Sequence, residues 1–241
     1  MIRLFSAFIA ITVALLIPIS CTTQDTPSTP EPLTIITHDS FDIGTEIIAA
    51  FEAEHNATVS IVKGGDAGEV INKAILTKGN PIGDVLYGID NTFLTRALNE
   101  NIFVKYRSPV LDNVDPIYHL DTEHRVMPVD VGFVAINYDD NWLSEAGLSP
   151  PNELEDLTQP QWKGLLVVQN PATSSPGLAF LLSTIAKFGE TGDYTYLDYW
   201  QELKENDVLV KNGWSDSYYS DFSLHGGERP LVVSYSTSPA A

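Results

Sequence analysis

Short apolar runs alternate with segments of helical periodicity from Leu33 to about residue 98. A buried strand gives a run of this kind, and an amphipathic helix repeats its apolar residues every three to four positions. The runs lie at 33–37, 57–62 and 84–88, and the helical patterns follow Ser40, cover 70–75 and follow Asn91. Asn91 is of a residue type that caps helices. This order predicts a mostly parallel sheet with helices on both faces.

The second half of the chain carries a similar set of patterns. Strands are predicted around 132–137 and at 165–169, 208–210 and 231–235, and helices at 175–189, 194–203 and 215–224. We therefore expect an α/β protein with two lobes, 33–134 and 135–241. An α/β lobe usually needs about 100–150 residues. The first lobe lacks a later return of the chain, so we expect it to be incomplete and the sequence to be a C-terminally truncated fragment.

The N-terminus has the features of an export signal. Arg3 precedes an apolar stretch from Ala7 to Ile19, and Ser20 and Cys21 form a junction of a small residue with the only cysteine. This pattern predicts a lipoprotein-type signal peptide over 1–21, with Cys21 as the lipidated residue. An ordinary secretory signal with an incidental Cys21 is the alternative. Residues 22–32 are rich in Thr and Pro, which predicts a disordered tether.

The net charge of the chain argues against some classes of binding partner. The chain has 13 Lys and Arg against 32 Asp and Glu, a formal net charge of -19. Nucleic acid and anionic lipid surfaces would be repelled, whereas a cationic ligand would be attracted. Solubility alone also explains an acidic surface. The lone cysteine excludes an internal disulfide.

Aromatic and hydroxyl side chains gather near the end of the sequence, between Lys211 and Pro239. The segment reads KNGWSDSYYSDFSLHGGERPLVVSYSTSP. It offers flat π faces and neutral hydroxyls and has little that acts as a strong base. Such a set suits holding a planar, positively charged small molecule better than transforming one.

Six motifs occur in an order that resembles one protein family. They are HDSF (38–41), GIDN (88–91), PVDVGFVAINYD (128–139), QNPATSSPGLAFLL (169–182), GWSDSY (213–218) and VVSYSTSP (232–239). Together they resemble the thiamine-binding periplasmic component of an ABC importer, a type II periplasmic binding protein. The resemblance implies two α/β lobes joined by a hinge, with the ligand in the cleft. The first crossing between lobes is expected near 130–135 and the return near 235–239, and the family's chain continues beyond this point.

The same resemblance implies a function and its partners. We expect an extracytoplasmic solute-binding protein that carries thiamine, thiamine monophosphate or thiamine diphosphate to an ABC permease and its ATPase. It is expected to be a monomer without a cofactor or metal, periplasmic or on the outer face of the cell membrane, and held to the membrane by its lipid alone.

The candidate ligand-binding residues follow from the chemistry of thiamine, two aromatic rings of which the thiazolium is cationic. Aromatic faces are expected from Trp214, Tyr218 and Tyr235, and a phosphate is expected at the helix start near Ser174 and Ser175. Core packing and helix capping are the alternative roles for these residues. Carboxylates at strand ends and neutral hydroxyls complete the set: Asp39, Ser40, Asp90, Asp130, Ser236, Thr237 and Ser238.

Three other functions remain open from the sequence. The tandem pair Tyr218 and Tyr219 resembles a ferric-iron site of a related importer. GWSDS departs from the nucleophile elbow of hydrolases at Ser217, and the HLDTEH segment lacks helical metal spacing, so we expect a solvated loop there and no enzymatic activity. An adhesive surface lipoprotein would bind no small molecule.

Overall fold

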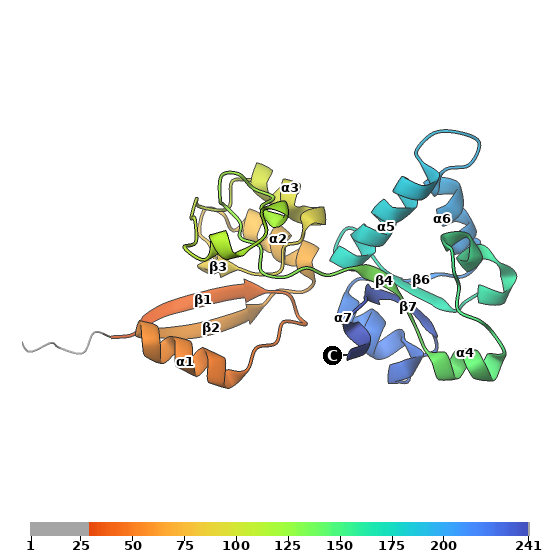
Figure 1. Ribbon diagram of the computed structural model, residues 1–241, viewed down its shortest axis with the longest axis horizontal. Coiled ribbons are helices and arrows are strands. Elements are labelled where there is room, and N and C mark those ends of the chain that lie inside the picture. Colours follow the sequence, from red (N-terminus) through yellow and green to blue (C-terminus); the bar gives the residue numbers. More distant parts are fainter. Residues whose placement is uncertain (1–28, 241) are drawn as a thin grey trace, which may run out of the picture.

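The computed structural model describes residues 29–240 and contains two sheets (Figure 1). The signal peptide, Cys21 and the tether up to residue 28 lie outside the described residues. We call the part around the first sheet lobe 1 and the part around the second sheet lobe 2; their predicted boundary at 134 and 135 stays a prediction. Figure 1 shows the two lobes side by side, joined by an extended segment that leads into β4.

The sheet of lobe 1 is parallel, with the order β2-β1-β3. Its strands are β1 (Glu31–Thr37), β2 (Ala57–Lys63) and β3 (Val85–Leu86). The β1 strand therefore includes the last two residues of the predicted tether. The β3 strand is shorter than expected from its apolar run, and Val85 is half-exposed.

Three helices connect and follow these strands, in the predicted order: α1 (Thr45–His55), α2 (Ala67–Leu76) and α3 (Asn91–Asn99). The prediction that Asn91 caps α3 is wrong. Asp90 is the capping residue, because its carboxylate accepts the backbone N–H groups of Thr92 and Phe93. A carboxylate accepts these bonds as well as an amide does and also favours the positive end of the helix dipole.

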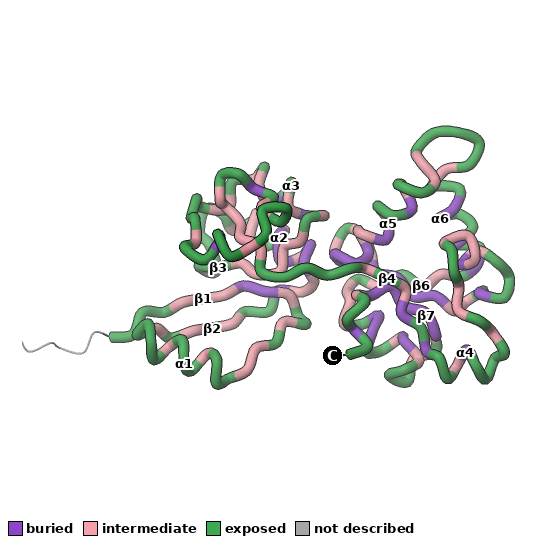
Figure 2. The backbone as a smooth tube through the Cα atoms, in the orientation of Figure 1, coloured by how far each residue is buried: buried purple, intermediate pink, exposed green. Residues whose placement is uncertain are grey.

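The core of lobe 1 is small. Its hydrophobic cluster of buried residues lies on α2 and α3 and consists of Ala67, Ile71, Phe93 and Ala97. Leu178, from lobe 2, packs against this cluster. Helix α1 contributes no buried residue, and Figure 2 shows its tube coloured as exposed or intermediate. Lobe 1 is therefore stabilised in part by its contact with lobe 2.

Lobe 2 has a mixed sheet with the order β4-β7-β5-β6. Its strands are β4 (Val134–Tyr138), β5 (Leu166–Gln169), β6 (Leu209–Lys211) and β7 (Leu231–Tyr235). β5 pairs in parallel with β6 and β7, whereas β4 runs antiparallel to β7. Both β5 and β7 are almost completely buried, as their continuous apolar runs predict.

The helices of lobe 2 are α4 (Asp140–Ala146), α5 (Ser175–Phe188), α6 (Tyr196–Glu205) and α7 (Trp214–Asp216). The helix predicted over 215–224 is irregular. The short α7 passes into a π turn at Ser217–Asp221 and then a 3-10 turn at Ser223–His225. Within residues 29–240, no helix combines the length and apolar character needed to cross a membrane.

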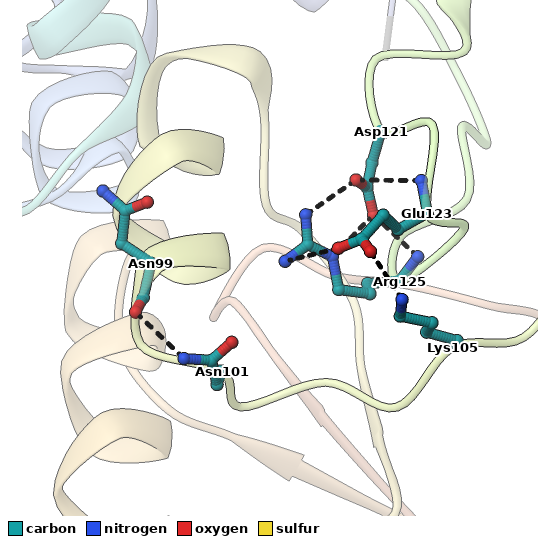
Figure 3. A network of polar contacts seen from close by, with 6 residues as sticks. All are labelled: Asn99, Asn101, Lys105, Asp121, Glu123 and Arg125. Carbon is teal, nitrogen blue, oxygen red and sulfur yellow. Dashed lines mark hydrogen bonds and ion pairs between the residues drawn. The ribbon is translucent and has the colours of Figure 1, made fainter.

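A long irregular segment leads from α3 to the crossing between the lobes. The HLDTEH part of it is a loop, as expected, and most of its residues are exposed or half-buried, but Asp121 is buried. The Asp121 carboxylate accepts the backbone N–H of Arg125 at 2.7 Å and its guanidinium at 2.8 and 3.0 Å. Glu123 pairs with the same guanidinium and with Lys105, so the network closes the loop (Figure 3).

Candidate interlobe binding site

A pocket of about 190 Å³ lies between the two lobes. Both lobes contribute to its walls. Its lining residues are Asp39, Ser40, Asp66, Glu69, Asn212, Gly213, Trp214, Ser215 and Asp216. Four of the nine are carboxylates and none is cationic. The pocket therefore combines a negative potential with one aromatic residue, Trp214.

The lobe 1 wall is built where the chain leaves β1 and enters α2. Asp66 caps α2 and forms a capping box with Glu69, whose carboxylate accepts the Asp66 backbone N–H. Asp39 follows β1 and accepts the backbone N–H of Gly65 at 2.8 Å. The carboxyl ends of parallel strands meet at one edge of the sheet, which is why these residues converge.

The lobe 2 wall is centred on Trp214 at the start of α7. Its indole Nε1 donates to the Ser234 hydroxyl at 2.7 Å. One face of the indole stacks on Tyr218, with centroids 4.9 Å apart and planes inclined by 17°. Tyr218 is itself 3% exposed and packs against Phe222. The candidate Tyr218 therefore stacks on the indole but does not line the pocket, whereas Trp214 lines it.

The STSP segment (236–239) contributes a hydroxyl that helps to hold the indole of Trp214. The hydroxyls of Ser234 and Ser238 lie 2.7 Å apart and form a chain with the indole N–H. Ser238 is buried, whereas Ser236 and Thr237 are exposed and do not line the pocket. Of the three hydroxyl candidates in this segment, Ser238 is the one that the structure connects to Trp214.

A second polar cluster lies at the crossing between the lobes. The Tyr87 hydroxyl donates to the Asp130 carboxylate at 2.8 Å, and burial together with this bond raises the pKa of Tyr87 to about 12. Burial also raises the pKa of Tyr235, and the charges of Asp90, Asp66 and Asp130 act in the same direction. Tyr235 therefore stays neutral among these carboxylates. Asp90 and Asp130 do not line the pocket.

His38 completes the strand edge of lobe 1. Its Nδ1 lies 2.8 Å from the Ser40 hydroxyl. Burial lowers its pKa, although Asp66, Asp130 and Asp39 act in the opposite direction. A Cβ on Gly88, which has a φ of +103°, would lie 2.4 Å from the His38 ring. Glycine thus meets both a backbone and a steric requirement at this position.

The start of α5 carries two hydroxyls that lack hydrogen-bond partners within the described structure. Ser174 is 0% exposed and Ser175 is 3% exposed, and neither Oγ atom has a bond. Ser174 occupies the capping position without capping the helix through its side chain. Plain N-capping, the alternative role from the sequence, does not explain Ser174.

Sequence reasoning missed Asp66, Glu69 and Asp216. Asp66 and Glu69 had a recognisable signal, because a capping residue followed three positions later by Glu marks a helix start. This start directly follows β2, so the carboxylates belong to the same strand edge as Asp39. Asp216 lies within the GWSDSY motif, which was the one signal that could have indicated it.

The tyrosine pair on which the ferric-iron alternative rests consists of one buried and one exposed ring. Burial raises the pKa of Tyr218, and the neighbouring Tyr219 acts in the same direction. Tyr219 is 52% exposed and meets Tyr218 edge-on. Among residues 29–240, no group of three or more His, Cys, Asp or Glu side chains is arranged to hold a metal ion.

Comparison with known proteins identifies the family. The model of the family described as "Bacterial extracellular solute-binding protein" matches residues 80–241. The thiamine-binding periplasmic protein of Escherichia coli (strain K12) is 33% identical over 214 residues, which cover 86% of this chain and 61% of the relative. The Haemophilus influenzae protein of the same name is 29% identical over 219 residues, covering 87% of this chain and 60% of the relative. The chain thus spans about 60% of the length of these relatives.

Solved structures agree with this assignment. A periplasmic thiamin binding protein superposes with a TM-score of 0.75 at 31% identity, covering 88% of this chain and 64% of that structure. Iron-bound HitA from Pseudomonas aeruginosa gives a TM-score of 0.66 at 23% identity, covering 86% and 63%; this match shows the fold alone. The type II periplasmic-binding-protein fold and the resemblance predicted from the six motifs are confirmed. The chain belongs to the bacterial extracellular solute-binding protein family.

Proposed function

We propose that this protein binds thiamine or a thiamine phosphate between its lobes, as the solute-binding component of an ABC importer. The observation that carries the proposal is the pairing of an aromatic face with carboxylates in one pocket, where Trp214 stands beside Asp39, Asp66, Glu69 and Asp216. The names of the relatives support the same ligand.

The pocket matches the positive charge and the aromatic rings of thiamine. Its thiazolium ring is a permanent cation, and a cation over an aromatic face gains about 0.5–2 kcal/mol. The carboxylates add attraction that steers the ligand into the pocket. Tyr218 and Ser234 hold the indole in place before the ligand arrives, which lowers the entropic cost of binding.

A phosphate ester on the ligand fits the start of α5. The unpartnered hydroxyls of Ser174 and Ser175 are suitable donors to a phosphate, and the start of a helix favours an anion. We propose this position for the phosphate of thiamine monophosphate or diphosphate. We also propose that Asp90, Asp130 and Tyr235, which lie outside the pocket lining, approach the ligand from the side of the crossing.

The family assignment supports further proposals about the whole system. The partners are the permease and ATPase of the importer, and the location is the periplasm or the outer face of the cell membrane. Lipidation at Cys21 anchors the protein, which acts as a monomer and binds its ligand without transforming it.

Isothermal titration calorimetry with thiamine, thiamine monophosphate and thiamine diphosphate tests the function. We expect one saturable site per chain and quenching of tryptophan fluorescence, because Trp214 is at the pocket. Choline is the matched control, since it carries the cation without the aromatic rings and is expected to bind much more weakly. Absence of binding heat with all three thiamine forms, in a protein with a cooperative unfolding transition, would contradict the proposal.

A further inference from the structure

The first turn of α2 makes two hydrogen bonds that cross from lobe 1 to lobe 2. The Asp66 carboxylate accepts the backbone N–H of Trp214 at 2.8 Å through Oδ2, while its Oδ1 caps α2. Two residues later, the backbone N–H of Gly68 donates to the carbonyl oxygen of Thr173 at 2.8 Å. One helical turn is therefore bonded to two separate segments of lobe 2.

These two segments lead into the two parts of the proposed site. Trp214 lines the pocket and begins α7, and Thr173 precedes Ser174, the capping residue of α5. The bond to Asp66 holds the backbone of Trp214, whereas Ser234 holds its indole. The position of the aromatic face relative to lobe 1 therefore depends on Asp66.

Residue 68 has to be small for these contacts to form. A Cβ at Gly68 would lie 2.7 Å from the Ala172 carbonyl oxygen and 2.8 Å from the Thr173 carbonyl oxygen. Contacts below 3.0 Å with backbone atoms force a displacement, and here the displaced atoms belong to the other lobe. Glycine at this position permits close approach of the lobes.

Apolar packing continues the same interface. Leu178, one turn into α5, packs against the lobe 1 cluster of Ile71, Phe93 and Ala97. The contact therefore combines two hydrogen bonds at the start of α2 with a buried leucine behind them. Because Asp66 and Gly68 belong to one rigid turn, a rotation that separates α2 from lobe 2 breaks both hydrogen bonds together.

We infer that the first turn of α2 is a latch that holds the lobes closed, with Asp66 as a positioning residue for Trp214 and Gly68 as the contact point. The latch regulates the proposed site and in that respect rests on the proposed function. Its mechanical part is independent of the ligand, since both bonds are made by the protein alone.

Amide hydrogen exchange resolved by NMR on the full chain tests the latch, because two of the exchanging groups are its own donors. Gly68→Ala separates the lobes sterically, and Asp66→Ser removes the bridge to Trp214 but keeps a capping hydroxyl on α2. Gly79→Ala is the matched control, since a Cβ there meets no atom within 4 Å. The amides of Glu69 and Val70 report whether α2 keeps its cap.

The decisive readout is the amide that each substitution does not touch. We expect Gly68→Ala to speed exchange of the Trp214 amide about tenfold or more, and Asp66→Ser to speed exchange of the Gly68 amide by a similar factor. Both variants lose the charge-assisted bond between Asp66 and the Trp214 N–H, and the loss of such a bond shifts an opening equilibrium by at least that factor. Gly79→Ala is expected to change neither amide. Unchanged exchange at the untouched amide in both variants would overturn the latch. If Gly68→Ala fails to fold, Asp66→Ser decides alone.

Adding thiamine separates the latch from the proposed function. With both correct, thiamine slows exchange of the Trp214 and Gly68 amides in the unsubstituted protein, and each variant binds thiamine more weakly than Gly79→Ala does. If thiamine changes neither amide while the effects of the substitutions persist, the latch stands and the proposed ligand is wrong. If thiamine binds but the untouched amides do not respond to either substitution, the ligand stands and the latch is wrong.

Discussion

The indole N–H of Trp214 donates to the hydroxyl of Ser234, 2.7 Å away on the neighbouring strand β7. Ser234 is completely buried, and its oxygen lies within 2.7 Å of the Ser238 hydroxyl. The aromatic face of the pocket is thus attached to the central part of the lobe 2 sheet. A surface tryptophan without these bonds would lose more conformational freedom when a ligand binds.

Ser234→Ala is expected to weaken thiamine binding about threefold to tenfold. The substitution leaves the indole N–H without its partner, and one hydrogen bond contributes about 0.5–1.5 kcal/mol. The stacking on Tyr218 remains, so the loss is partial. Calorimetry measures the affinity, and circular dichroism checks that lobe 2 is folded.

Ser183→Ala is the matched control, because the Ser183 hydroxyl bonds only to a carbonyl of its own helix, that of Phe180. This control is expected to keep the affinity of the unsubstituted protein. Equal affinities for Ser234→Ala and Ser183→Ala would show that the bond to Ser234 does not organise the site.

The sequence patterns predicted the order of strands and helices well, because buried parallel strands and amphipathic helices have distinct periodicities. The irregular α7 was predicted as one regular helix, since periodicity alone does not reveal a π turn. Asp90 illustrates a second limit. Its position after a strand predicted a ligand contact, yet its carboxylate is used to cap α3.

Three of the predicted ligand-binding residues lie together at the pocket, and their contact with a ligand stays a prediction. Trp214, Asp39 and Ser40 line the pocket, as expected from the motifs. Asp66 was missed because its role depends on a contact with a residue 148 positions away, and no local pattern encodes such a distance. Ser236 and Thr237 share a motif with Ser238 but are exposed, because they form the turn between β7 and the 3-10 turn at Ser238–Ala240.

Asp216→Asn is expected to weaken thiamine binding about twofold to fivefold at low salt. Asp216 lines the pocket and is exposed, so its charge acts through partly screened attraction. The effect should shrink as the salt concentration rises. Titrations at two ionic strengths measure it, with Asp140→Asn on the exposed start of α4 as the control. A loss that does not depend on salt would contradict an electrostatic role.

Asp121→Asn is expected to lower the free energy of unfolding by about 1–3 kcal/mol at pH 7, because the buried Asp121 loses its charge-assisted bonds to Arg125. Those bonds hold the pKa of Asp121 well below its usual range. A carboxyl whose pKa is lower in the folded state stabilises the protein above its unfolded pKa of about 3.9, and that contribution is lost as the pH falls below this value.

The difference between Asp121→Asn and the unsubstituted protein should therefore be constant between pH 6 and 7 and shrink below about pH 4. Urea unfolding at several pH values measures it. Asp112→Asn is the control, because Asp112 is 72% exposed in its pair with Arg107 and such pairs contribute little. A difference that is the same at pH 3 and pH 7 would show that the charge of Asp121 is not what stabilises the loop.

Gly177→Ala is expected to destabilise lobe 2 and to disturb the proposed phosphate position together. A Cβ at Gly177 would lie 2.4 Å from the carbonyl oxygen of Gln169, which belongs to the buried strand β5. Helix α5 has to move away from the sheet to relieve this contact, and overpacking of this kind costs about 1–3 kcal/mol. Ser174 and Ser175 begin the same helix and move with it. Thermal unfolding and binding of thiamine monophosphate measure the two effects, and Gly79→Ala is expected to show neither. A Gly177→Ala protein with unchanged stability would mean that α5 does not rest on β5 at this point.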